Sequence, residues 1–98
     1  MIVTEEQAID IFMYIASTLN CNDVKLSNSY LMAKDIDTCF WFSVFLVNDD
    51  GRYHYAFEHD YISLLDRIIQ FKYLIIKDEV YKIPNSIEEF FIEMDLNE

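Results

Sequence analysis

Glycine and proline are nearly absent from this chain of 98 residues, which has one of each. β-Barrels and β-sandwiches place such residues at their many turns, so their scarcity argues against an all-β protein. It favours longer helices and strands joined by polar turns. The single glycine, Gly51, also excludes the glycine-rich loops that cradle phosphates, and with them the usual nucleotide-binding folds.

Cysteine and histidine are almost as scarce, with two residues of each. Cys21, Cys39, His54 and His59 show no spacing typical of a zinc or calcium site and no nucleophile–base pairing. Residues 1–20 lack the basic start and continuous apolar stretch of a secretory signal, and the densest apolar stretch is far shorter than a membrane span. We therefore expect a cytoplasmic protein with reduced thiols, no catalytic residues, no metal and no cofactor.

Basic residues are outnumbered, because Lys and Arg total 7 whereas Asp and Glu total 18, for a formal net charge of −11. A protein that grips nucleic acid needs a basic face, and an anionic membrane repels an acidic surface for the same reason. The charge therefore disfavours direct nucleic-acid or membrane binding and favours a basic protein partner. The alternative is that the acidity only keeps an apolar chain soluble.

Apolar residues are abundant, at 53% hydrophobic and 16% aromatic. This suffices for one packed core but not two, and it predicts a single acidic domain over residues 1–98. Helix signals are local and clear. Residues 4–7 form a capping box before an apolar stripe, Asp60 can cap an amphipathic segment, and residues 86–89 form a second capping box after Pro84.

Three segments between the first two helices predict strands. Residues 24–32 suggest one strand, although Ser27, Asn28 and Ser29 are turn formers that could interrupt it. Residues 39–47 are apolar on both alternating faces, which predicts a central strand covered on both sides. Residues 52–58 alternate aromatic and polar side chains, as expected of a strand with one solvent-exposed side.

A later segment, residues 73–83, leaves two alternatives open, a second small hairpin or a continuation of the preceding helix. The expected fold class is therefore α+β. It has a small antiparallel sheet of three or more strands with helices packed on it, in the order α-β-β-β-α-(ββ)-α.

Clusters of carboxylates are the best candidates for a binding site. Carboxylates held on a rigid surface can imitate DNA phosphates and occupy a basic nucleic-acid groove. The candidate partner-binding residues lie at a predicted hairpin tip, at the entry to the central strand and on the last helix: Asn48, Asp49, Asp50, Gly51, Asp35, Asp37, Glu88, Glu89 and Glu93. Asp95 and Glu98 extend the last cluster.

The Asn48-Asp49-Asp50-Gly51 hairpin, the tyrosine-rich strand after it and the helix that contains Ile62 and Ile69 make residues 47–71 resemble a small phage anti-CRISPR family of DNA mimics. The resemblance implies an inhibitor of a type II RNA-guided nuclease. Its carboxylates would face the arginines that read the PAM, and its hairpin tip would point toward a nuclease active site.

Two other classes compete. The element order resembles type III secretion chaperones, small acidic cytosolic proteins in which residues 73–83 have a counterpart. That resemblance implies a dimer that holds an unfolded effector segment on apolar grooves. An immunity protein that covers a basic toxin nuclease would use the acidity as a DNA mimic does. The inhibitor is the leading hypothesis, with the chaperone or immunity protein as the alternative, and either a monomer or a homodimer is consistent with the sequence.

Overall fold

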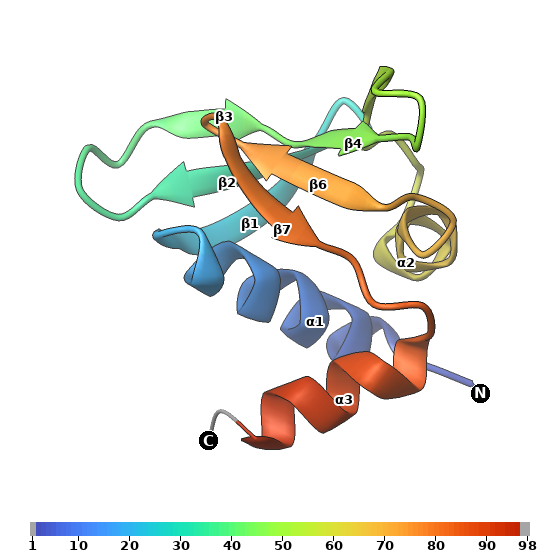
Figure 1. Cartoon of the computed structure of the whole chain (residues 1–98). Coiled ribbons are helices and arrows are strands. Elements are labelled where there is room, and N and C mark those ends of the chain that lie inside the picture. Colours follow the sequence, from blue (N-terminus) through green and yellow to red (C-terminus); the bar gives the residue numbers. More distant parts are fainter. Residues whose placement is uncertain (1, 97–98) are drawn as a thin grey trace.

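The computed structural model describes residues 2–96 and confirms the α+β class (Figure 1). It contains three helices and two antiparallel sheets. The elements in chain order are α1 (Glu5–Thr18), β1 (Cys21–Ser27), β2 (Tyr30–Asp35), β3 (Trp41–Ser43), β4 (Phe45–Val47), β5 (Tyr53–Tyr55), α2 (Tyr61–Ile68), β6 (Tyr73–Ile76), β7 (Glu79–Lys82) and α3 (Ile87–Leu96). The strand order is β1-β2-β3 in one sheet and β5-β4-β6-β7 in the other.

The predicted N-terminal signals of the first two helices are confirmed. The Thr4 hydroxyl accepts from the Gln7 amide at 3.1 Å, and the Gln7 side chain accepts from the Thr4 amide at 3.0 Å. Asp60 caps α2 by accepting from the Ser63 amide at 2.7 Å. These three hydrogen bonds satisfy backbone donors that a helix start leaves unpaired.

The prediction of one strand over residues 24–32 is wrong, because the turn formers divide it. β1 and β2 pair as an antiparallel hairpin in which Ser27 lies opposite Tyr30. The two residues between them, Asn28 and Ser29, have φ values of 52° and 67°. Positive φ at both central residues is the geometry of the two-residue turn that matches the twist of paired strands.

A second hairpin closes in the same way and settles the alternative left open for residues 73–83. β6 pairs with β7 from Tyr73 opposite Lys82 to Ile76 opposite Glu79. Lys77 and Asp78 form the turn, with φ values of 53° and 65°. The segment is therefore a hairpin and not an extension of α2.

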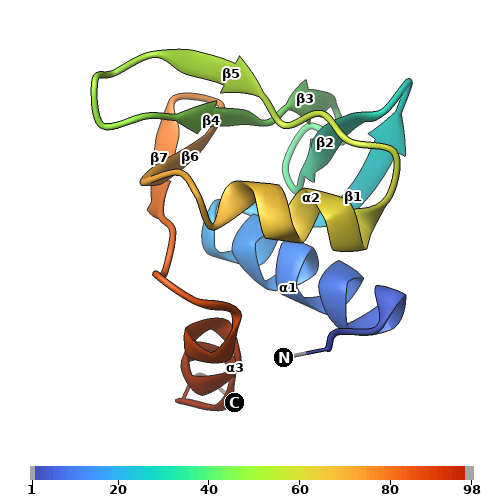
Figure 2. The ribbon, with the colours of Figure 1, turned by 90° about the vertical axis from the view of Figure 1, so that its right-hand side faces the viewer.

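The run from Trp41 to Val47 belongs to both sheets. β3 pairs with β2, β4 lies between β5 and β6, and buried Val44 joins them. Figures 1 and 2 show all three helices on one side of the strands, where Leu46 and the core of α1 are buried. No helix covers the other face of this strand, where Phe45 is half-buried and Val47 is buried. The prediction that the strand is covered on both sides therefore holds at Val47 but not along its whole length.

The solvent-exposed side of the strand after Gly51 is the aromatic one. Tyr53, Tyr55 and Phe57 are exposed, whereas His54 is only partly exposed and Ala56 is fully buried. Ala56 explains the orientation, since its small side chain fits beneath the sheet while its amide donates to the Val44 carbonyl at 3.1 Å. Among the described residues, no helix is long and apolar enough to cross a membrane.

Candidate functional site

The predicted hairpin tip forms as a tight turn between β4 and β5. The Gly51 amide donates to the Asn48 carbonyl at 3.0 Å, and the Asn48 amide donates to the Arg52 carbonyl at 3.0 Å. Gly51 has a backbone φ of +80°, a conformation that residues with a Cβ rarely adopt. The Asn48 side chain lies 3.0 Å from His54 Nε2. These contacts hold Asp49 and Asp50 outward in a defined position.

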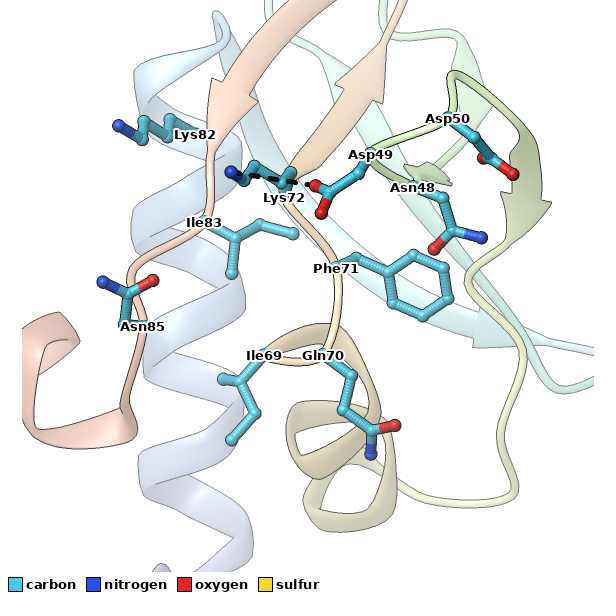
Figure 3. Close-up of a pocket in the computed structure, with 10 residues that line it drawn as sticks. All are labelled: Asn48, Asp49, Asp50, Ile69, Gln70, Phe71, Lys72, Lys82, Ile83 and Asn85. Carbon is cyan, nitrogen blue, oxygen red and sulfur yellow. Dashed lines mark ion pairs between the residues drawn. The ribbon is translucent and has the colours of Figure 1, made fainter.

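Both tip aspartates are exposed and lie near basic side chains. Asp50 Oδ2 is 3.2 Å from Arg52 Nε, and Asp49 Oδ1 is 3.8 Å from Lys72 Nζ. Figure 3 marks the ion pair between Asp49 and Lys72, which lies in the segment before β6. Exposed ion pairs of this kind contribute about 0–1 kcal/mol, so a partner with better-placed cations can replace them at little cost.

A groove of about 630 Å³ lies beside the tip (Figure 3). It is lined by Asn48, Asp49, Asp50, Ile69, Gln70, Phe71, Lys72, Lys82, Ile83 and Asn85. A second cavity of about 280 Å³ shares Lys82, Ile83 and Asn85 with it and adds Pro84, Glu89 and Glu93. The structure thus brings the hairpin tip and two of the acidic residues of α3 to adjoining cavities, although they are far apart in sequence.

The carboxylates of α3 are partly engaged. The Glu89 amide donates to Ser86 Oγ at 3.4 Å, as the second predicted capping box requires. The Glu89 side chain accepts from the Asn85 amide at 3.0 Å, one residue before the Ser86 amide that a capping box would use. Glu93 accepts from the Tyr81 hydroxyl at 2.9 Å. Burial, with this hydrogen bond, raises the pKa of Tyr81. Glu88 is exposed, and Glu98 lies outside the described residues.

Asp35 and Asp37 do not join this site. The Asp35 side chain is buried and forms an ion pair with Lys77, and it also accepts from the Thr38 amide at 2.9 Å and the Thr38 hydroxyl at 2.8 Å. Asp37 is exposed and accepts from the Asn20 side chain at 2.9 Å. The prediction that Asp35 faces a partner is wrong, because its carboxylate is buried and bonded to Lys77 and Thr38.

The Asp35 ion pair gives stability a pH dependence. The Lys77 ammonium, and then the Thr38 donors, lower the pKa of Asp35 to about 2 from an ordinary value near 3.8. A carboxyl whose pKa is lowered by folding stabilises the protein above its unfolded pKa, and that contribution is lost as pH falls toward the folded pKa. The melting temperature of wild type should therefore exceed that of Asp35→Asn at neutral pH, and the gap should shrink between about pH 4 and pH 2.

Thermal melts followed by circular dichroism test this, with Asp37→Asn as the matched control. Asp37 is exposed, so its variant should melt close to wild type throughout. A gap for Asp35→Asn that stays the same at pH 7 and at the acid end would contradict the assignment.

The histidines, cysteines and carboxylates are also possible metal ligands or reactive groups. Among residues 2–96, no group of three or more His, Cys, Asp or Glu side chains could hold a metal ion. His54 contacts Asn48 and the Phe71 ring, and the His59 ring lies 6.1 Å from the Phe57 ring. Cys21 is buried and Cys39 is exposed, and both are free thiols.

The sequence prediction missed an exposed group of aromatic side chains on the side of the sheets opposite the helices. We call it the aromatic face, and it consists of Tyr30, Phe45, Tyr53, Tyr55 and Phe57. Their rings form a chain with centroid distances between 4.8 and 6.1 Å. The available signal was Ala56, whose small size marks the buried side of its strand.

Comparisons with known proteins add no family. No protein-family model, no curated protein and no solved structure matches the chain.

Proposed function

We propose that this protein binds a basic protein partner and inhibits it by presenting carboxylates where that partner would receive nucleic acid. The observation that carries the proposal is the meeting of the Asp49–Asp50 tip with Glu89 and Glu93 around adjoining cavities. The tip aspartates line one cavity, and Glu89 and Glu93 line the other. Lys72 lines the first cavity and Lys82 lines both, so carboxylates in fixed positions outnumber the lysines there by four to two. A basic nucleic-acid site is built to receive such a pattern.

The balance of surface charge supports the same proposal. Asp35 is the one buried charged residue among residues 2–96, so the remaining described carboxylates stay at least partly in contact with solvent. Asp35, Asp49 and Asp50 form ion pairs with Lys77, Lys72 and Arg52. These three cations are far fewer than the carboxylates of the chain. Most of the negative charge is therefore available to attract a basic partner, and it speeds encounter as well as strengthening contact.

The finer proposal is that the target is an RNA-guided nuclease of type II. The hairpin tip suits this role because it extends beyond the core on an ordered turn, so little conformational entropy is lost when it enters a groove. In such a complex the tip aspartates would lie against arginines that otherwise read DNA bases. An immunity protein against a basic toxin nuclease would use the same surface.

The test is binding to a purified type II nuclease loaded with guide RNA, measured by calorimetry from low to high salt. Charge mimicry is screened by salt, so we expect the affinity to fall by about tenfold or more over that range and double-stranded DNA carrying the PAM to compete. Absence of binding to this nuclease would remove the finer proposal. Salt-sensitive binding to a basic toxin nuclease in the same assay would then support the broader proposal of a basic protein partner, and no binding to either nuclease would count against it.

A second candidate, a chaperone that holds an extended apolar segment, is favoured by the aromatic face. Tyr53 and Tyr55 are 61% and 52% exposed there, and both rings contact Phe45, so they form a contiguous exposed patch of the kind that marks interaction sites. Binding to such a segment would depend on apolar contact, and its affinity would change little between low and high salt.

A further inference from the structure

We propose that the aromatic face is a self-association surface, through which two copies of the chain pack sheet against sheet. This goes beyond the proposed function, because it concerns the side of the molecule away from the helices and engages a second copy in place of a foreign partner. Three observations carry it: the arrangement of the rings, their exposed area and the distribution of charge around them.

The rings form a continuous patch across neighbouring strands. Phe45 on β4 lies opposite Tyr55 on β5 and opposite Ile75 on β6, and Ile75 lies opposite Val80 on β7. One row of apolar side chains thus crosses the four-stranded sheet. Tyr30 extends the patch toward β2, with its ring centroid 5.0 Å from that of Tyr55. The patch is broad and follows the sheet surface, as a sheet-on-sheet interface requires.

Its exposed area approaches what a stable dimer needs. Exposure is 38% for Tyr30, 61% for Tyr53, 52% for Tyr55, 42% for Phe57 and 38% for Tyr73. Tyr73 adjoins the aromatic face, because it lies in one row with Val47 and Tyr53. With roughly 200 Å² for each ring residue, Tyr73 and the four exposed rings of the face leave on the order of 450 Å² in contact with water. That is more than half of the roughly 800 Å² that a standard interface takes from each partner. Val80, 56% exposed on β7, adds to it.

The distribution of carboxylates favours a second copy of the chain as the partner of the aromatic face. Two copies that each carry a net charge of −11 repel each other wherever their carboxylates meet. Strands β2 to β7 contain only two carboxylates, Asp35 and Glu79. Asp35 is buried, and Glu79 lies opposite buried Ile76 in a row that faces the helices. The strand residues at the centre of the aromatic face therefore include no carboxylate, so two acidic copies can meet at this centre without opposing negative charges there.

Basic side chains lie at the border of the face and not at its centre. Lys25 Nζ is 4.2 Å from the Trp41 ring centroid, and Lys34 Nζ is 5.8 Å from it. Asp23 on edge strand β1 shares this end, opposite Lys34. The apolar centre is thus free to pack against its own copy. A single patch that meets itself gives a two-fold symmetric dimer, the commonest symmetry of small assemblies.

Sedimentation velocity over a micromolar to millimolar concentration range tests the proposal on the full chain. We expect the wild-type mass to rise toward twice the monomer mass, and association to strengthen with salt because salt screens the repulsion between copies. The binding of the proposed basic partner should weaken with salt, so the two proposals fail separately.

Two variants on opposite edge strands, Tyr53→Asp and Val80→Asp, should each weaken self-association at least about tenfold, because each buries a charge in the apolar interface. Ile92→Asp is the matched control. Ile92 is 59% exposed on α3, on the helical side, so this variant should associate as wild type does. Circular dichroism melts identify a variant that fails to fold. If one edge-strand variant fails, the sedimentation result for the other tests the proposal.

Three outcomes would overturn the proposal: a wild type that stays monomeric at every concentration, edge-strand variants that associate as wild type does, or an equal loss in Ile92→Asp. A monomeric wild type whose aromatic face instead binds a synthetic extended peptide rich in Leu and Phe would assign this face to the chaperone candidate.

Discussion

Replacing Phe90 by alanine is expected to lower the free energy of unfolding by about 3–5 kcal/mol, the usual cost of removing a buried phenylalanine ring. Phe90 is fully buried and is the one buried side chain of α3. Its ring stacks on that of Tyr81, with centroids 6.4 Å apart and planes 13° from parallel. No other side chain of α3 is as deeply held, so the docking of this helix depends chiefly on this residue.

Urea unfolding followed by fluorescence or circular dichroism measures this loss. Phe91→Ala is the matched control, because Phe91 is only partly buried against the same core and should cost clearly less. A loss below about 1 kcal/mol for Phe90→Ala would mean that α3 is not docked through this ring. Since Glu89 and Glu93 are carried on the same helix, the variant should also reduce binding of the basic partner at temperatures where the rest of the domain stays folded.

The second large effect is expected on binding. Replacing Asp49 and Asp50 together by alanine should change the free energy of unfolding by no more than about 0.5 kcal/mol, because both side chains are exposed and their ion pairs contribute little. If the tip enters a basic groove, loss of the charge-assisted contacts should cost about 2–5 kcal/mol of binding, so the affinity falls by a factor of tens or more.

Calorimetric titration against the target nuclease measures the effect, with Asp10→Ala/Asp66→Ala as the matched control. Those aspartates are exposed on α1 and α2, so the control removes the same charge away from the tip. Equal losses in the two double variants would show that only net charge matters. Unchanged binding in the tip variant would remove the hairpin from the proposed site.

Gly51→Val separates the geometry of the tip from its charge. A Cβ at this position would meet no atom within 4 Å, so the cost comes from the φ of +80° and not from a clash. A left-handed conformation costs a residue with a Cβ roughly 1–2 kcal/mol. Stability and binding should therefore both fall in this variant, whereas Asp49→Ala/Asp50→Ala should lose binding alone.

The features that sequence predicted well are those set by a few neighbouring residues. The capping residues Thr4 and Asp60 act on amides within the next turn of their own helices, and Gly51 acts within its own turn, so local chemistry was sufficient. The turn at Asn28 and Ser29, which the sequence left as an alternative to one continuous strand, was also local. Its residues are turn formers, but the apolar side chains on either side suggested one continuous strand.

The features that sequence missed depend on distant partners. Asp35 looked like one more surface carboxylate because Lys77, which neutralises it, is 42 residues away in the chain. The orientation of Tyr53 and Tyr55 depends on which side of the sheet the helices cover, and alternation alone cannot distinguish an aromatic side that is buried from one that is exposed. The adjoining cavities of the hairpin tip and of Glu89 and Glu93 likewise arise only when β7, paired with β6, returns the chain to a position opposite Tyr73.

The strand run that passes through Val44 has a mechanical consequence. The Val44 amide donates to the Leu31 carbonyl at 3.0 Å, and its carbonyl accepts from the Ala56 amide, so one residue is bonded to β2 and to the chain that follows β5. A pull on the 48–51 tip by a bound partner passes along β4 directly into β3 and the first sheet. Since Val44 alone separates the two strands, we expect the two sheets to move together under such a load.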